Sequence, residues 1–249
     1  MALDLASTIS YRAATFPRCV FLHTGGSKVI SCWSAKGGSG TTVVAVALAV
    51  LCGRKSEHGA VLVDLGGDGP TVFGVPEPDG PGLSDWLVAS DAVRSSALSR
   101  LEHQVGNDVH LIPRGRRALA GEARASQCIE RMTADERPII VDVGRITNRD
   151  EPADMVRRRF VEEATASLLV TRPCFIALRR ALSLPVRPTG VVLVEEEGRA
   201  LGPTDVEDVL GVPVVARVAL DASVARAVDA GLLASRLPTP LGRSLRDVA

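Results

Sequence analysis

Short runs of apolar and β-branched residues alternate along the chain with longer segments whose apolar residues recur at helical spacing. Several of the short runs are apolar at successive positions, as in strands that are covered on both faces. The runs that we predict to be strands are Lys28–Trp33, Ala60–Leu65, Asp108–Ile112, Pro138–Val143, Ala166–Thr171, Thr189–Val194 and Val212–Val218. The segments predicted to be helices are Thr41–Gly53, Leu83–Leu101, Ala118–Thr133, Pro152–Ala164, Phe175–Leu184, Thr204–Leu210 and Ser223–Leu233.

This alternation predicts βαβ units joined by right-handed crossovers. We therefore expect an α/β fold: a single doubly wound domain over residues 28–249, with a seven- or eight-stranded, mostly parallel sheet flanked by helices. Residues 1–27 have no strong pattern and are expected to be an N-terminal extension, in which Cys19–His23 could add an edge strand. The Pro- and Gly-rich segment Gly66–Gly82 is too short for a domain linker and is expected to be a loop.

Composition narrows the function classes. The 29 basic and 29 acidic side chains cancel, so the sequence as a whole provides no positive field for a dedicated nucleic-acid binder. Aromatic residues make up only 3% of the 249 residues, which argues against a stacking surface for single strands. The five cysteines show no CxxC spacing, which favours buried, reduced thiols in a cytoplasmic protein over zinc ligands.

The segment from Val29 to Leu51 carries the chemistry. An apolar strand enters a glycine-rich turn, and the turn leads directly into a helix that opens with Thr41 and Thr42. Glycines let backbone N–H groups converge on an anion, and the helix N-terminus adds the positive end of its dipole. This context predicts a phosphate-binding loop, with the Thr42 hydroxyl placed to ligate Mg²⁺.

The usual phosphate-loop pattern, G-x-x-x-x-G-K-[ST], is broken at two positions. Ala35 stands at the first glycine, and Thr41 stands where the phosphate lysine should be. A lysine is present earlier in the loop, at Lys36. The chain has only three lysines, Lys28, Lys36 and Lys55, so the presence of one inside this loop favours a functional role for it.

The segment KGGSGTT, from Lys36 to Thr42, resembles the deviant Walker A motif of the MinD/ParA ATPases, K-G-G-x-x-K-[ST]. The resemblance implies the P-loop NTPase fold, with ATP and Mg²⁺ as cofactors. It also implies that Lys36 reaches across a homodimer to the partner's nucleotide. The residues expected to bind the nucleotide are Lys36, Gly37, Gly38, Ser39, Gly40, Thr41 and Thr42.

Further segments from about Ser27 to the C-terminus are similar to the family in the same order. Ala60 to Gly67 resembles the family's second strand, which ends in an aspartate, here Asp64, and Pro138 to Gly144 resembles its Walker B strand, which carries Asp142. Leu168 to Leu182 is similar to a segment of the CpaE/TadZ branch, and Asp208 to Leu232 has the shape of the family's C-terminal part. The resemblance implies catalytic roles for Lys36, Asp64 and Asp142, and metal binding by Thr42 and Asp142.

Three departures bear on hydrolysis. Thr41 replaces the second lysine, as in CpaE/TadZ-like and septum-site-determining relatives with a degenerate P-loop. The second acid of the D-x-D sequence is Gly66, for which Asp68 could substitute. The adenine-reading asparagine is absent near Val194 and Glu195. Asp64 and Asp142 could also simply cap the loops that follow their strands.

Two basic regions have alternative interpretations. The arginine clusters Arg114/Arg116/Arg117 and Arg157/Arg158/Arg159 could form a DNA-tracking patch, although the neutral net charge favours solvated helix faces. The C-terminal segment from Thr239 to Ala249 is weakly amphipathic. A terminal helix docked on the core is favoured there over a MinD-like membrane anchor.

The leading hypothesis is an ATP-binding positioning protein, cytoplasmic and recruited to a membrane or pole, that dimerises around nucleotide. It would localise pilus, secretion or cell-division machinery, with weak or no hydrolysis because of Thr41. The alternatives are an active ATPase that cycles on DNA or membrane, and a nucleotide-free scaffold that retains the fold.

Overall fold

The sheet organises the whole domain. The computed structural model describes residues 29–90, 95–106 and 108–249. The predicted N-terminal extension, with the edge strand that Cys19–His23 could add, lies outside these residues. Within them, eight strands form one sheet in the order β3-β4-β2-β5-β1-β6-β7-β8. The strands are β1 Val29–Ser34, β2 Ala60–Asp64, β3 His103–Gln104, β4 Val109–Ile112, β5 Ile139–Arg145, β6 Ala166–Thr171, β7 Gly190–Glu195 and β8 Val214–Ala219.

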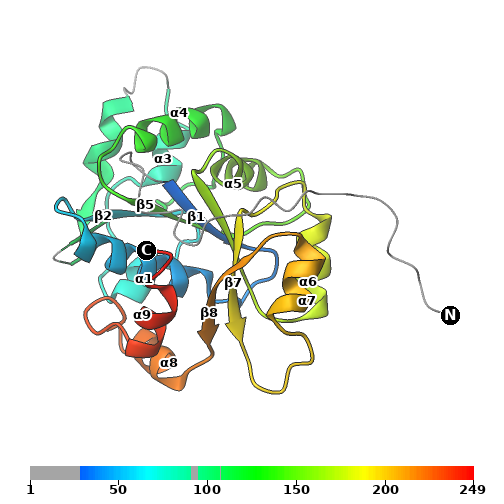
Figure 1. Ribbon diagram of the computed structural model, residues 1–249. Helices are drawn as coiled ribbons and strands as arrows, with labels where there is room; N and C mark the ends of the chain where they lie inside the picture. Colours follow the sequence, from blue (N-terminus) through cyan, green and yellow to red (C-terminus); the bar gives the residue numbers. More distant parts are fainter. Residues whose placement is uncertain (1–28, 91–94, 107) are drawn as a thin grey trace.

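Helices cover both faces of this sheet (Figure 1). They are α1 Thr41–Lys55, α2 Gly69–Phe73, α3 Leu83–Leu87, the 3₁₀ helix η1 Ser95–Leu101, α4 Glu122–Thr133, α5 Pro152–Glu162, α6 Phe175–Ser183, α7 Pro203–Leu210, α8 Ala222–Asp229 and α9 Thr239–Leu245. Helices α1, α2, α8 and α9 pack on one face, and α3, η1, α4, α5 and α6 pack on the other, with α7 beside α6. The predicted doubly wound, mostly parallel α/β architecture is thus confirmed.

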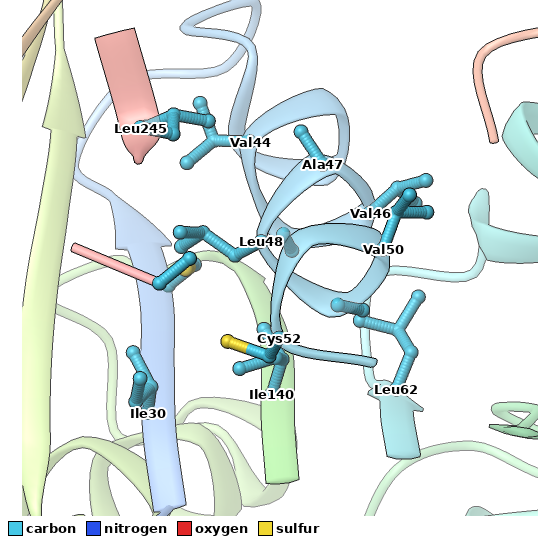
Figure 2. Close-up of a cluster of buried hydrophobic side chains, with 14 of the residues drawn as sticks. Ile30, Val44, Val46, Ala47, Leu48, Val50, Cys52, Leu62, Ile140 and Leu245 are labelled. Carbon is cyan, nitrogen blue, oxygen red and sulfur yellow. The ribbon is translucent and has the colours of Figure 1, made fainter. Parts of the chain in front are cut away.

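The central strands are apolar at successive positions because both of their faces are buried. In β1, Ile30 and Cys32 face the cluster around α1, whereas Val29 and Trp33 belong to the cluster on the opposite face. Figure 2 shows α1 at the centre of the first cluster, with Leu48 and Val44 among side chains from several strands and from α9. This packing fixes the helix that follows the glycine loop.

The strand order reverses around β1. The chain runs from β1 to β2 and β4, returns to β5 beside β1, and then crosses to β6 on the other side of β1. All pairings among these strands are parallel, so their carboxyl ends meet at one edge. Ligands of open α/β sheets bind at such an edge, near the point where the strand order reverses.

Several predicted boundaries are wrong. The antiparallel strand β3 was not predicted, and the expected helix Leu83–Leu101 is instead α3 followed by η1. Arg124 explains the break after α3, because its Nη1 donates to the carbonyls of Ala89 and Ser90 at 2.8 and 3.1 Å. The Arg124 guanidinium also lies 4.1 Å above the Trp86 ring. These carbonyls are therefore satisfied outside a helix.

Two helices are shorter than predicted, and one helix was not predicted. Helix α4 begins only after Gly121, which has a φ of 91° and is packed against the backbone of Leu87. Helix α8 ends at Asp229 because the backbone at Gly231 lies directly against Gly74. The Gly66–Gly82 segment, expected to be a loop, contains the short helix α2.

The C-terminal segment docks on the core, as favoured from the sequence. Leu241 and Leu245 of α9 are buried in the cluster around α1. Lys55, at the end of α1, donates to the carbonyls of Arg246 and Ala249 at 3.0 and 2.8 Å. Among the described helices, none combines the length and apolar character needed to cross a bilayer.

Candidate functional site

The glycine loop connects β1 to α1 at the carboxyl edge of the sheet. Gly38 and Gly40 have φ values of 75° and 90°, in the left-handed region that L-residues rarely adopt. A Cβ added at either glycine would meet no atom of the described residues within 4 Å, so among these residues the space beside the loop is open. The Ser39 hydroxyl donates to the Lys36 carbonyl at 2.7 Å and holds the loop closed on itself. The loop thus has the curvature and the open space that an anion needs.

The start of α1 is left without a side-chain cap. Its N-cap residue is Gly40, and its first turn contains no acidic residue. The first N–H groups of a helix have no partner within the helix, and they favour an anion. Thr41 lies in this turn and is 7% exposed, whereas Thr42 is half-buried and close to Asp142.

Asp64 and Asp142 end up side by side. They are register partners at the ends of the parallel strands β2 and β5, and both are fully buried. Burial and the neighbouring Asp64 charge raise the pKa of Asp142 to about 7, although the Thr42 hydroxyl and the Gly144 N–H favour its ionised form. Asp142 Oδ2 is buried and has no hydrogen-bond partner among the described residues. The structure therefore brings together Thr42 and Asp142, the two predicted metal ligands.

Asp64 has a different environment. Its two carboxylate oxygens accept hydrogen bonds from the N–H groups of Gly67 and Gly69, at 2.6 and 2.8 Å. Burial is the main cause that raises its pKa, and these two N–H groups oppose it. Asp64 thus organises the turn into α2, which is the capping role weighed from the sequence, while it lies next to Asp142.

Asp68 and Gly66 complete this side of the site. Asp68 is exposed at the start of α2, and its charge raises the pKa of both Asp64 and Asp142. A Cβ on Gly66 would lie 3.0 Å from Asp142 Oδ2. A larger residue at position 66 would therefore crowd the Asp142 carboxyl in this arrangement.

Lys36 lies toward the residues that follow β6 and β7, whereas Asp64 and Asp142 lie at the ends of β2 and β5, on the other side of β1. The pKa of Glu196, after β7, is lowered mainly by its hydrogen bonds from Arg199, and the pKa of the Cys174 thiol, after β6, mainly by the Ala177 N–H. The Lys36 charge adds to both shifts. Lys36 is half-buried, and no ion pair joins it to a residue in the described part of the chain. Its ammonium group therefore has no carboxylate partner within this chain's described residues.

Cys174 corrects one expectation from the sequence. Cys32, Cys52 and Cys128 are buried, as expected, but Cys174 is partly exposed at the N-cap of α6. The N–H groups of Ala177 and Ile176 are the main causes that lower its pKa. Cys19 lies outside the described residues.

The two arginine clusters do not form one patch. Four of the six arginines have an acidic partner within 3.4 Å: Arg116 with Asp79, Arg117 with Asp85, Arg158 with Asp150, and Arg159 with Glu122. Arg114 and Arg157 lie instead at the carboxyl edge, close to Gly67 and Asp142. Arg145, at the end of β5, also lies there and was not singled out from the sequence. The sequence signal that could have found it is its position three residues after Asp142.

Three features define a P-loop NTPase fold: the mostly parallel sheet, the glycine loop between the first strand and its helix, and the acidic ends of β2 and β5. Solved structures make this assignment more specific. The MinC:MinD cell division protein complex from Aquifex aeolicus matches with a TM-score of 0.70 and 17% identity, over 89% of this chain and 93% of that one.

Two further solved structures are similar over the same extent. The septum site-determining protein MinD from Pyrococcus horikoshii OT3, complexed with Mg-ADP, matches with a TM-score of 0.68 and 19% identity, over 89% of this chain and 94% of that one. A ParA family ATPase from Chlorobium tepidum TLS matches with a TM-score of 0.67 and 17% identity, over 90% and 98% of the two chains. No protein-family model and no curated protein sequence matches the chain. The chain therefore has the fold of the MinD and ParA ATPases.

Proposed function

We propose that this chain is a MinD/ParA-type ATP-binding positioning protein that dimerises around nucleotide and hydrolyses it weakly or not at all. The observation that carries the proposal is the open glycine loop with Gly38 and Gly40 at positive φ, followed by an uncapped helix. The similar MinD structure from Pyrococcus horikoshii is complexed with Mg-ADP. That likeness supports a nucleotide as the anion.

The residues at the loop fit a Mg²⁺–nucleotide. The N–H groups of the loop from Gly37 to Gly40 and of the first turn of α1 would hold phosphate oxygens. Thr42 and Asp142 would hold the metal ion, directly or through water, because Mg²⁺ prefers hard oxygen ligands. The buried, unpartnered Oδ2 of Asp142 supports this assignment. The metal ion, when bound, neutralises phosphate charge.

Weak hydrolysis is expected from the residues at two positions, 41 and 66. Thr41 offers no positive charge where charge redistributes during phosphoryl transfer. Gly66 offers no carboxylate to orient a water molecule, and Asp64 is occupied by the N–H groups of Gly67 and Gly69. A dimer without rapid hydrolysis would persist for as long as ATP remains bound.

Dimerisation would use Lys36. Its ammonium group has no carboxylate partner among the described residues, and the loop that carries it is exposed at Gly37 and Gly38. If Lys36 contacts the nucleotide of a second copy, nucleotide binding and dimerisation become one linked equilibrium. The similar structure of a MinC:MinD complex supports recruitment of a partner protein of pilus, secretion or division machinery by a cytoplasmic dimer at a membrane or pole.

Light scattering after size-exclusion chromatography tests the proposal. We expect the wild-type chain to be monomeric without nucleotide or with ADP, and dimeric with ATP and Mg²⁺. Lys36→Ala should remain monomeric under all three conditions. Arg226→Ala, which removes an exposed charge from α8, is the matched control and should behave as the wild type does.

Each alternative gives a different result. A thermal unfolding midpoint that does not change at millimolar ATP and Mg²⁺ would contradict the proposal and favour a nucleotide-free scaffold. Turnover stimulated by DNA or by lipid vesicles would favour an active cycling ATPase.

A further inference from the structure

Arg145 lies against the glycine loop. It is the last residue of β5 and the register partner of Ser34, which immediately precedes the loop. Its Cδ atom lies 3.8 Å from the position that a Cβ on Gly37 would occupy. The side chain of Arg145 therefore follows the outside of the loop at the point where the loop backbone is exposed.

Arg145 has no acidic partner there. Its side chain is exposed and forms no ion pair or hydrogen bond with the residues described. Two arginines that follow Arg145 in the chain do have acidic partners. Arg149 Nη1 lies 3.2 Å from Glu151 Oε1, and Arg158 Nη1 lies 3.3 Å from Asp150 Oδ1. The Arg145 guanidinium is thus available to an anion bound at the loop.

Arg114 extends the positive charge toward the aspartates. Its Nη1 and Cδ each lie 3.4 Å from the position that a Cβ on Gly67 would occupy, and Nη1 reaches the Gly66 carbonyl at 3.4 Å. No carboxylate lies within 4.0 Å of the Arg114 guanidinium among the described residues. The turn that Arg114 contacts lies next to the end of β5, which carries Arg145. Gly144, the residue before Arg145, packs closely on Gly66: a Cβ on Gly144 would lie 3.2 Å from the Gly66 Cα.

Arg157 adds a third guanidinium. Its side chain is 17% exposed, and its Nε is buried with no hydrogen-bond partner among the described residues. Its ion pair with Asp154 is long, at 3.9 Å, because the Asp154 carboxyl already accepts hydrogen bonds from Thr147. Burial and the repulsion from Arg114 lower the pKa of Arg157. The Arg114 and Arg157 guanidinium groups are thus close enough to repel each other, and of the two only Arg157 has an acidic partner, Asp154, among the described residues.

We propose that Arg145 contacts the terminal phosphate of ATP and supplies the positive charge that Thr41 lacks, with Arg114 and Arg157 completing a basic cluster on this side of the loop. This inference depends on the proposed nucleotide site. A guanidinium offers two parallel N–H donors to phosphate oxygens, which gives it both charge and geometric fit. Lys36 lies on the other side of the loop, so the two cations do not duplicate each other.

The inference predicts a preference for ATP over ADP in the monomer. A charge-assisted contact with the terminal phosphate is absent in ADP, so its loss should affect the two nucleotides differently. We expect Arg145→Gln to weaken ATP binding about 10- to 100-fold and ADP binding less than about threefold. Arg145→Lys should retain part of the ATP affinity, because it keeps the positive charge but loses the two parallel N–H donors of the guanidinium.

Isothermal titration calorimetry of the full chain with Mg-ATP and Mg-ADP measures these differences. Arg149→Gln is the matched control, since it removes an arginine of the same segment that is paired with Glu151, and both affinities should remain unchanged. Because Arg145 forms no hydrogen bond or ion pair with another side chain in the described part of the chain, Arg145→Gln should unfold at the wild-type temperature. Adding Thr41→Lys to Arg145→Gln should restore ATP binding.

The outcomes separate this inference from the proposed function. If wild type binds neither nucleotide, both fail. If wild type binds ATP but Arg145→Gln binds it equally well, or loses ATP and ADP affinity equally, the nucleotide site stands and the role of Arg145 is refuted. If Thr41→Lys does not restore ATP binding to Arg145→Gln, the claim that Arg145 supplies the charge missing at position 41 is also refuted.

Discussion

Replacing Asp142 by asparagine should stabilise the free protein at neutral pH. The pKa of this carboxyl rises from its ordinary 3.8 to about 7 in the fold, because it is buried beside Asp64. Between these pH values the folded protein holds a proton that the unfolded chain has released. The free energy of unfolding therefore falls as pH rises from about 4 to about 7, and then levels off.

The magnitude follows from the same two pKa values. One pKa unit corresponds to about 1.4 kcal/mol, so the ionised carboxyl costs the wild type on the order of 4 kcal/mol above pH 7. Asp142→Asn removes this titration while its side-chain oxygen can still accept from the Gly144 N–H. The measured quantity is the unfolding free energy of Asp142→Asn minus that of the wild type. This difference should be several kcal/mol larger at pH 8 than at pH 4.5.

Urea unfolding followed by the fluorescence of Trp33 and Trp86 at several pH values measures this difference. Asp79→Asn serves as the control, since the Asp79 side chain is fully exposed and should show no pH-dependent gain. If the difference between Asp142→Asn and wild type is the same at pH 4.5 and pH 8, the carboxyl titrates normally and the reasoning is wrong.

Three further predictions concern the loop and the core. Gly40→Ala and Gly211→Ala both place a Cβ at a position of positive φ with no described atom nearby, so each should lower the free energy of unfolding by about 1–2 kcal/mol. Only Gly40→Ala should also abolish the increase in unfolding temperature caused by ATP. Thr41→Lys should strengthen ATP binding by the monomer about 10- to 100-fold and raise turnover, as measured by calorimetry and phosphate release; unaltered binding would mean that the phosphate lies elsewhere. Leu245→Ala should lower the free energy of unfolding by about 2–5 kcal/mol in urea, because Leu245 is completely buried, whereas Leu182→Ala, at a position 46% exposed, should change it little.

The segments that carry the site could be predicted because local and tertiary signals agree in them. From Val29 to Lys55, buried strand positions, loop glycines and an apolar helix all indicate one structure, and α1 begins at Thr41 as predicted. The pairing of Asp64 with Asp142 also follows from the sequence, because parallel strands bring their carboxyl ends to one edge.

The remaining features depend on contacts between distant parts of the chain. The break after α3 depends on Arg124, which lies 34 and 35 residues beyond the carbonyls that it binds. The grouping of Arg114 with Arg157, and the separation of both from their sequence neighbours, depend on which acids lie opposite each side chain. No local pattern contains that information.

The burial of α1 determines which part of the protein can respond to a ligand. Strands lie on one side of this helix, with α2 and α9 beside it, and side chains around most of its circumference are enclosed (Figure 2). Sliding it along its axis would open voids throughout that half of the interior. The glycine loop is thus a fixed support, and structural adjustment upon ligand binding falls to the turns that follow β2 and β5, which carry the acidic and guanidinium groups.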